Sequence, residues 1–292
     1  MAELVRLSRP WLLASIRAQT FPVAPVVARG FSSTSNHDRQ TGPTRSSRQK
    51  MPTLRQPSFL LPSTLVTPPL SKFPRTPKEF AGFVYYIFKA RLQAVGANIG
   101  AKIMSMPRTL LSRPKLKLGR SQAVPTGKAL HVQMSEAVAA GDAETIRRIC
   151  LPELADSLVA SMQTRPRGIR YAWQLVKYNS TVSYPRLADF RAVTMPLPGS
   201  TQTQIVRQAV VSIASTQRIG RYDDTKGGTL VPGSERTQDL VEHLVLQSNV
   251  SMQTWVAEPW KIWGTINEST YQDSLDIEAG TKLLYKRQAK GV

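Results

Sequence analysis

Cationic side chains are the groups in this sequence best suited to bind a ligand. Residues 1–120 hold 20 Lys and Arg against 3 Asp and Glu, a net charge of +17, whereas residues 121–292 have a net charge of +3. Such a front half attracts phosphate, from RNA or from an anionic lipid surface, and its field speeds encounter with either. A solvated tail that binds nothing is the alternative. The candidate phosphate contacts are the basic residues from position 89 to 120: Lys89, Arg91, Lys102, Arg108, Arg113, Lys115, Lys117 and Arg120.

Catalytic chemistry has two candidate residues, Asp189 and His243, because a general base needs a buried carboxylate or imidazole. Asp189 alternates with Arg191 and is expected to pair with it or to face solvent. His243 lies in an apolar run and is expected to be a structural histidine. One cysteine, Cys150, and three scattered histidines cannot assemble a disulfide framework or a zinc site. We therefore expect a protein that is not an enzyme and that holds no cofactor or metal.

The first 31 residues have the composition of a mitochondrial transit peptide. They are rich in Arg and Ser, and Glu3 is their single acid. The run Val27–Ser33 resembles a matrix-protease site, with an Arg shortly before an aromatic residue, so we expect cleavage after Phe31. A secretory signal is disfavoured because the apolar run from Trp11 is short and is followed by Arg17.

Residues 32–78 are rich in proline, which removes backbone donors and stops helices, so an extended basic arm is expected. Residues 79–106 predict one amphipathic helix, too short in its uncharged run to cross a bilayer. The helix is expected to lie on a membrane or a ribonucleoprotein, or else to pack on the protein's own domain. Its candidate apolar docking face is formed by Phe80, Phe83, Val84, Ile87 and Phe88.

Residues 107–122 predict a basic linker without regular structure, because Pro107, Pro114 and Gly119 interrupt it. Its cations alternate with leucines, a pattern that suits an RNA crevice or a lipid headgroup layer equally.

Residues 123–287 predict one α+β domain, followed by a short tail at 288–292. Three short helices are expected first: one ending at Gly141, one capped by Asp142 and one starting at Pro152. About four antiparallel strands are expected after them, around residues 171–175, 204–218, 240–252 and 260–266. The segment from Met195 to Thr203 fits no pattern. The tryptophans of this domain are expected to be packing groups.

Two stretches of the domain resemble a known family. The run Met134–Asp142, followed by Cys150–Leu154, resembles the helical opening of the Tim-forty-four-like domain, and Trp260–Gly264 resembles its closing strand. Within that family the leader and the basic arm look most like protein forty-five of the mitochondrial large ribosomal subunit and the related fungal inner-membrane ribosome receptor. The resemblance implies an NTF2-like cone near the polypeptide exit of the mitochondrial ribosome, facing the inner membrane.

Two binding functions are consistent with these features. The first is a structural component of the mitochondrial large subunit, with the arm on large-subunit rRNA and the domain holding the ribosome at the inner membrane for protein insertion. Its other partners would be neighbouring mitoribosomal proteins, the insertion machinery and nascent chains. The second is an import-motor docking subunit that binds anionic lipid and chaperones. The Pro-rich, nearly acid-free arm favours the first. Either function places the protein in the matrix, peripheral to the inner membrane.

Overall fold

The computed structural model describes residues 59–107, 112–179, 184–196 and 202–289, with side chains as far as Gly280. The expected leader, most of the basic arm and Arg108 lie outside the described residues. All described elements belong to one unit, Gln56–Val292.

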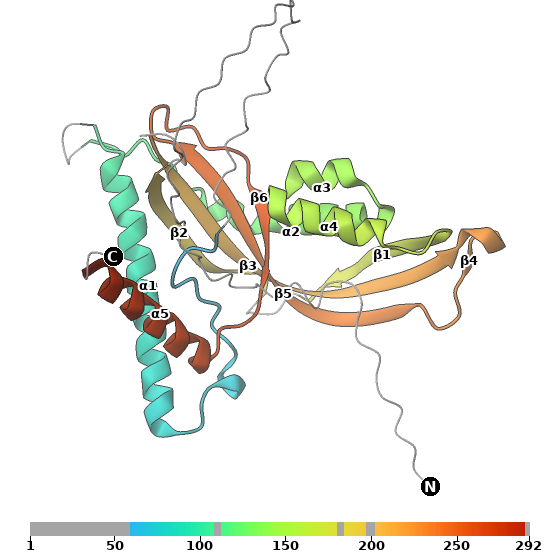
Figure 1. The fold of residues 1–292 in the computed structure, drawn as a ribbon, viewed down its shortest axis with the longest axis horizontal. Helices are drawn as coiled ribbons and strands as arrows, with labels where there is room; N and C mark the ends of the chain where they lie inside the picture. Colours follow the sequence, from blue (N-terminus) through green and yellow to red (C-terminus); the bar gives the residue numbers. More distant parts are fainter. Residues whose placement is uncertain (1–58, 108–111, 180–183, 197–201, 290–292) are drawn as a thin grey trace, which may run out of the picture. The chain divides into compact units, whose positions relative to one another are not determined.

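A six-stranded antiparallel sheet forms the centre of this unit (Figure 1). Its strands are β1 (Ile169–Tyr178), β2 (Arg186–Pro196), β3 (Thr203–Asp223), β4 (Thr229–Leu230), β5 (Arg236–Ser251) and β6 (Lys261–Ile266). The long strand β3 is central. Strand β5 pairs along one side of it, while β2 and β1 share the other side, β2 near the start of β3 and β1 near its end. Strand β6 extends the sheet beyond β5.

Helices lie around the sheet. They are α1 (Pro77–Met104), α2 (Arg120–Ala140), α3 (Ala143–Ile149), α4 (Pro152–Gln163) and α5 (Tyr271–Ala289), with short 3-10 turns at Leu70–Lys72 and Asp224–Lys226. The predicted helix signals of the domain are confirmed. Gly141 ends α2 at φ +77°, the Asp142 carboxylate accepts from the amides of Glu144 and Thr145, both at 3.0 Å, and Pro152 opens α4.

Helix α2 covers one face of the sheet at close range. A Cβ atom on Gly127 would lie 3.0 Å from a methyl group of Val211 on β3, so any larger residue would push α2 or Val211 away from its present position. Residues 59–66 cover the opposite face, to which the alternate residues of β3 point. There Val66 packs with Ala188, Val210 and Val245, and the Leu61 amide donates to the Gln208 side chain at 2.9 Å.

This packing corrects the extent of the arm. Leu61, Leu65 and Val66 are almost fully buried, so the last part of the segment expected to be an arm belongs to the folded domain. These three side chains gain the burial energy of core residues, roughly 1.5–3 kcal/mol each. The domain therefore begins well before residue 123.

The α+β class is confirmed, and several elements differ from expectation. The helix expected over 79–106 runs Pro77–Met104, and α2 begins at Arg120, inside the expected linker. Strands β2 and β4 and helix α5 were not predicted. The β2 sequence lacks alternation because it is buried on both faces near Asp189 and Arg191, so charged residues occupy core positions in a strand.

Candidate interaction surface

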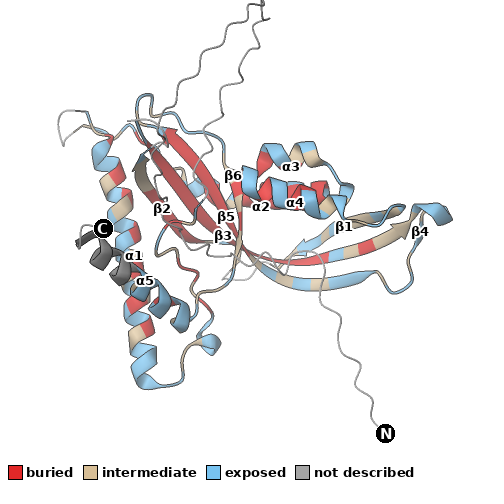
Figure 2. Ribbon diagram, in the orientation of Figure 1, coloured by how far each residue is buried: buried red, intermediate tan, exposed pale blue. Residues whose placement is uncertain are grey.

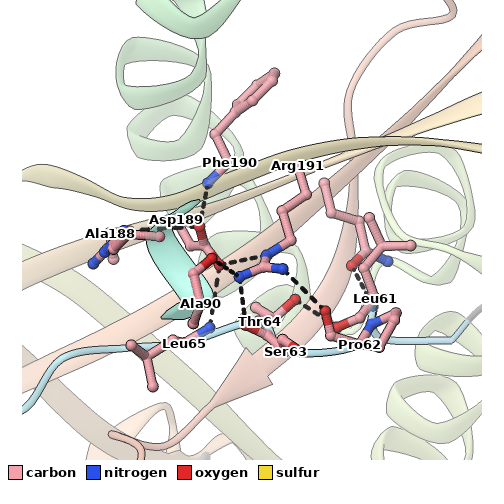
Figure 3. A network of polar contacts seen from close by, with 12 residues as sticks. Leu61, Pro62, Ser63, Thr64, Leu65, Ala90, Ala188, Asp189, Phe190 and Arg191 are labelled. Atoms are coloured by element: carbon pink, nitrogen blue, oxygen red, sulfur yellow. Dashed lines mark hydrogen bonds and ion pairs between the residues drawn. The ribbon is translucent and has the colours of Figure 1, made fainter. Parts of the chain in front are cut away.

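A buried ion pair on β2 holds the start of the described chain against the sheet (Figure 3). The Arg191 guanidinium lies 2.9 Å from the Asp189 carboxylate, and both side chains are more than nine-tenths buried. The remaining Arg191 hydrogens are donated to backbone carbonyls, among them Pro62 at 3.2 Å and Ala90 at 3.0 Å. Asp189 in turn accepts from the Leu65 amide at 3.1 Å. A buried ion pair stabilises a fold only when its other hydrogen bonds are also satisfied. Here those bonds come from residues 62–65 and from Ala90 of α1, so the network joins both segments to β2.

Helix α1 runs along the outer edge of β2. The Asn98 amide donates to the Phe190 carbonyl at 2.9 Å, and Arg91 donates to the Ala188 carbonyl. These contacts satisfy polar groups that an edge strand would otherwise expose. The residues of α1 buried against the domain include three alanines, and the two large ones lie in its first half: Phe83, Tyr86, Ala90, Ala94, Asn98 and Ala101.

Two residues of the predicted docking face therefore point inward, which corrects that prediction. Phe83 is 1% exposed, with its ring centroid 5.1 Å from that of Phe73 and 6.1 Å from that of Tyr271. Ile87 packs against the buried cluster of Leu65, Tyr86 and Ala90. Phe80, Val84 and Phe88 are exposed, as a docking face requires.

The exposed face of α1 carries a longer apolar stripe, which we name the α1 stripe. Its residues recur at steps of three or four, the spacing of one helical face. Figure 2 shows buried and exposed residues alternating along this helix. None of the helices within the described ranges is long and apolar enough to span a membrane. The α1 stripe consists of Phe80, Val84, Phe88, Leu92, Val95, Ile99 and Ile103, exposed by 42% to 61%.

The candidate cations of α1 have different surroundings. The Lys89 ammonium bonds the Glu278 carboxylate of α5 at 2.8 Å, which raises the pKa of Lys89. Arg91 lies 3.7 Å from Asp189 and bonds Ala188. Both cations thus contribute to internal contacts, a correction to their assignment as phosphate contacts. Lys102 is exposed near the C-terminal end of α1.

The linker before α2 is held to the sheet by its backbone and by its leucines. We call residues 112–119 the strap. Leu116 is buried, and its amide donates to the Ser105 hydroxyl at 3.2 Å. The carbonyls of Lys117 and Leu118 accept from Arg207 of β3 at 2.9 and 3.1 Å.

Arg207 is itself fixed on several sides. It donates to the Ser248 hydroxyl at 2.6 Å, and its guanidinium lies 4.8 Å from the ring centroid of Trp260. Burial lowers the pKa of Arg207. Because the strap is anchored by main chain and leucines, Arg113, Lys115 and Lys117 stay exposed, and none of them has an ion-pair partner among the described residues. Arg120, at the start of α2, is exposed and lies over the Phe190 ring.

The residues considered for catalysis have structural surroundings. Asp189 pairs with Arg191, as predicted. The His243 Nδ1 lies 2.8 Å from the Ser212 hydroxyl and its Nε2 lies 3.9 Å from Glu268. Burial lowers the pKa of His243, and burial raises the pKa of the Cys150 thiol to about 12.

One buried polar network was missed at the sequence level. The fully buried His131 of α2 bonds Glu242 of β5 at 2.8 Å, and Glu242 also accepts from Gln217 at 2.6 Å. The Trp173 indole donates to Gln217 at 2.8 Å. The sequence signal that could have found this network is the helical spacing: His131 precedes Met134 by three residues and so lies on the same inner face of α2. These bonds join α2 to three strands and explain why Trp173 is a packing group.

An α+β domain that presents an apolar helix face and an anchored cationic strap has the features of a binding protein for a membrane or a polyanion. A family model described as MBA1-like protein matches residues 108–287, more than half of the chain. The chain therefore belongs to the MBA1-like family, which is mitochondrial and associates with the ribosome at the inner membrane. No individual curated protein matches the chain.

Proposed function

We propose that this protein is a structural component of the mitochondrial large ribosomal subunit near the polypeptide exit. In this proposal the basic arm and the strap bind large-subunit rRNA, and the α1 stripe rests on the matrix face of the inner membrane. The protein acts by binding and has no catalytic role. Its Tim-forty-four-like resemblance, and within it the likeness to protein forty-five of the large subunit, support this assignment.

The exposure of the α1 stripe is the observation that carries the proposal. The inner face of α1 already packs on the domain, so the outer stripe is available for a partner. An amphipathic helix of this kind lies in the membrane interface with its apolar side chains among the acyl chains. Lys102 and the strap cations lie near the C-terminal end of the stripe, where they can reach anionic headgroups or RNA phosphates.

The strap is the described part of the rRNA contact. Three exposed cations within five residues, held by an anchored backbone, lose little conformational freedom when they bind phosphate. Each phosphate neutralised by Lys or Arg also releases counterions, so affinity for RNA falls steeply as salt rises. The remaining cations of the arm act in the same way.

Sedimentation of mitochondrial lysate through a gradient tests the assembly. The protein is expected to comigrate with the large subunit and to leave it as salt is raised. Migration with the import translocase instead would favour the import-motor docking function and contradict the proposal.

A quadruple variant tests the strap. Changing Arg113, Lys115, Lys117 and Arg120 together to Ala is expected to flatten the logarithmic salt slope of ribosome binding by up to roughly 3, because each lost phosphate contact contributes about 0.7–0.9. The control removes Arg147 and Arg148, two exposed cations on α3. Unchanged ribosome binding with lost binding to anionic liposomes would assign the strap to lipid instead, at about 1 kcal/mol per cation.

A further inference from the structure

A hollow lies between helices and sheet at the other end of β3 from α1. It has a volume of about 480 Å³ and sits between the C-terminal end of α2, helix α4 and the start of β1. Its walls are mainly apolar, with Val159, Met162 and Ile169 among them. Gln163, Arg165, Arg170 and Tyr171 are its polar lining residues. We name this hollow the arginine pocket.

Two guanidinium groups contact the aromatic ring of Tyr171, that of Arg165 from within the pocket and that of Arg221 from beside it. The Arg165 guanidinium lies 4.6 Å from the ring centroid of Tyr171, and that of Arg221 lies 5.6 Å from the same centroid. Tyr171 and Arg221 are directly opposed on β1 and β3, so the strand register sets this arrangement. Arg165 also donates to the Ala139 carbonyl, and partial burial lowers its pKa. The ring therefore holds both cations in fixed positions.

Among the described residues, no carboxylate forms an ion pair with either of these two cations. The stretch from Gln163 to Tyr178 contains four basic side chains and no acidic one. Arg170 pairs with Asp224 at 3.4 Å, but both groups are largely exposed and such a pair contributes little. Two like charges gathered on one ring repel each other, and a bound anion would remove that cost. Phosphate suits the site because planar guanidinium groups bind it with paired hydrogen bonds.

We propose that the arginine pocket binds an RNA strand, with one phosphate on Arg165 in the hollow, a neighbouring phosphate on Arg221 at the far contact of the Tyr171 ring, and a nucleoside against the apolar wall. This inference rests on the proposed function and adds a second RNA contact, on the folded domain. Unpaired RNA is commonly recognised through stacking on aromatic rings and guanidinium planes.

The position of the pocket favours RNA over a membrane surface. Phe190, which binds α1, is paired with Ala209 of β3, whereas Tyr171 is paired with Arg221, twelve positions further along. At about 3.3 Å per residue the two sites are separated by up to about 40 Å. The pocket is also separate from the exposed α1 stripe, the face proposed to lie on the membrane.

The test uses the full mature chain and a short oligouridylate as the probe. Arg165→Gln combined with Arg221→Gln is expected to flatten the logarithmic salt slope of binding by about 1.4, two contacts at about 0.7 each for single-stranded nucleic acid. The charge-matched control, Arg147→Gln with Arg148→Gln on α3, is expected to leave the slope unchanged. Ultraviolet crosslinking of the wild-type complex is expected to label Tyr171, and the double variant is expected to lose that label.

A second variant guards against misfolding of the first. Arg167→Gln removes an exposed cation beside the pocket that forms no hydrogen bond or ion pair with a described residue, and is expected to flatten the slope by about 0.7. Crosslinks confined to the arm and strap, or equal slopes for pocket and control variants, would overturn the inference. The inference would also be overturned if a pocket variant still bound RNA but no longer bound vesicles of phosphatidylcholine and phosphatidylglycerol. The proposed function has its own readout, cosedimentation of the wild-type protein with the large subunit, so the two can fail separately.

Discussion

The two ends of β3 have opposite surroundings although one strand passes through both. Every residue of β3 from Gln204 to Gln217 is buried, whereas most from Arg218 to Asp223 are exposed or half-buried (Figure 2). At the first end, residues 59–66, α1 and α2 cover the sheet and the edge of β2. At the second end, strands β1 and β5 flank β3, and arginines stack on tyrosines.

This difference shows that the elements packed on each end of the sheet determine which side chains are exposed there. The α1 end is stabilised by its own packing and presents apolar side chains beyond it. The other end exposes arginines, which keep a lightly covered sheet soluble and leave cations free for a polyanion. The apolar stripe is confined to the α1 end, whereas exposed cations lie at both ends, in the strap and around β1.

The largest expected effect comes from removing the cover of the α1 end. A chain that starts at residue 123 loses the nearly complete burial of Leu61, Leu65, Val66 and Phe83, worth about 6–12 kcal/mol. That loss is comparable to the total stability of a domain. We expect this chain not to unfold cooperatively on heating, whereas a chain that starts at residue 59 does. Cooperative unfolding of the chain that starts at residue 123 would show that the sheet folds without residues 59–122.

Breaking an ion pair at each end should have unequal costs. Arg191→Met leaves the buried Asp189 carboxylate without its charged partner and is expected to lower the free energy of unfolding by about 3–5 kcal/mol. Arg170→Met breaks the exposed pair with Asp224 and should cost less than about 1 kcal/mol. Urea denaturation of both variants measures the difference. Equal costs would mean that the network of β2 does not stabilise the α1 end.

Trp260 tests the anchor of the strap. Its half-buried ring contacts the Arg207 guanidinium and lies 6.3 Å, centroid to centroid, from the Phe190 ring. Trp260→Ala is expected to cost about 3 kcal/mol, the lower end of the range for a buried aromatic residue. Denaturant unfolding measures it, with Trp263→Ala as the aromatic control, because Trp263 packs on the Val66 cluster away from the strap. A decrease in the free energy of unfolding below about 0.5 kcal/mol would mean that the Trp260 ring does not stabilise the domain and is available to contact a partner.

The α1 stripe should affect membrane binding and leave stability unchanged. Phe88 is 61% exposed, so Phe88→Ser is expected to weaken binding to anionic liposomes by about 2 kcal/mol, roughly 30-fold, without lowering the midpoint of thermal unfolding. Val241→Ser, an exposed apolar residue on β5, is the control and should bind as the wild type does. Liposome flotation measures the binding of both variants. Equal losses of binding for Phe88→Ser and Val241→Ser would show that the α1 stripe has no specific role in membrane binding.

The smallest effect concerns acid stability. Burial lowers the pKa of His243, with Glu268 opposing and Arg186 and Lys72 assisting the shift. The unfolded chain then binds a proton near pH 6.5 that the folded chain does not, so stability falls as pH drops from about 7 to 5 and is flat above. His243→Gln should remove this decline in unfolding free energy. A decline of the same size in the variant would assign it to other groups.

Local rules in the sequence determined many of the elements. Gly141, Asp142 and Pro152 marked helix ends through their own backbone and capping chemistry, which depends on neighbours in the chain. The charge division between the two halves and the strap cations were likewise evident without a structure. Strand β2 was not predictable, because Asp189 and Arg191 occupy core positions only when residues 61–65 and α1 supply partners for them.

The sequence by itself determined that one helix lies at about residues 79–106, found at Pro77–Met104, but the tertiary structure decided which side of it faces the domain. Apolar periodicity marked one stripe of large side chains, which was assigned to a docking face with packing on the domain as the alternative. The edge of β2 requires close approach, and small side chains such as Ala90, Ala94 and Ala101 permit it. The bulky stripe was therefore left outside. The arginine pocket was equally a tertiary result, since the pairing of β1 with β3 brings Arg165 and Arg221 to one ring from positions far apart in the chain.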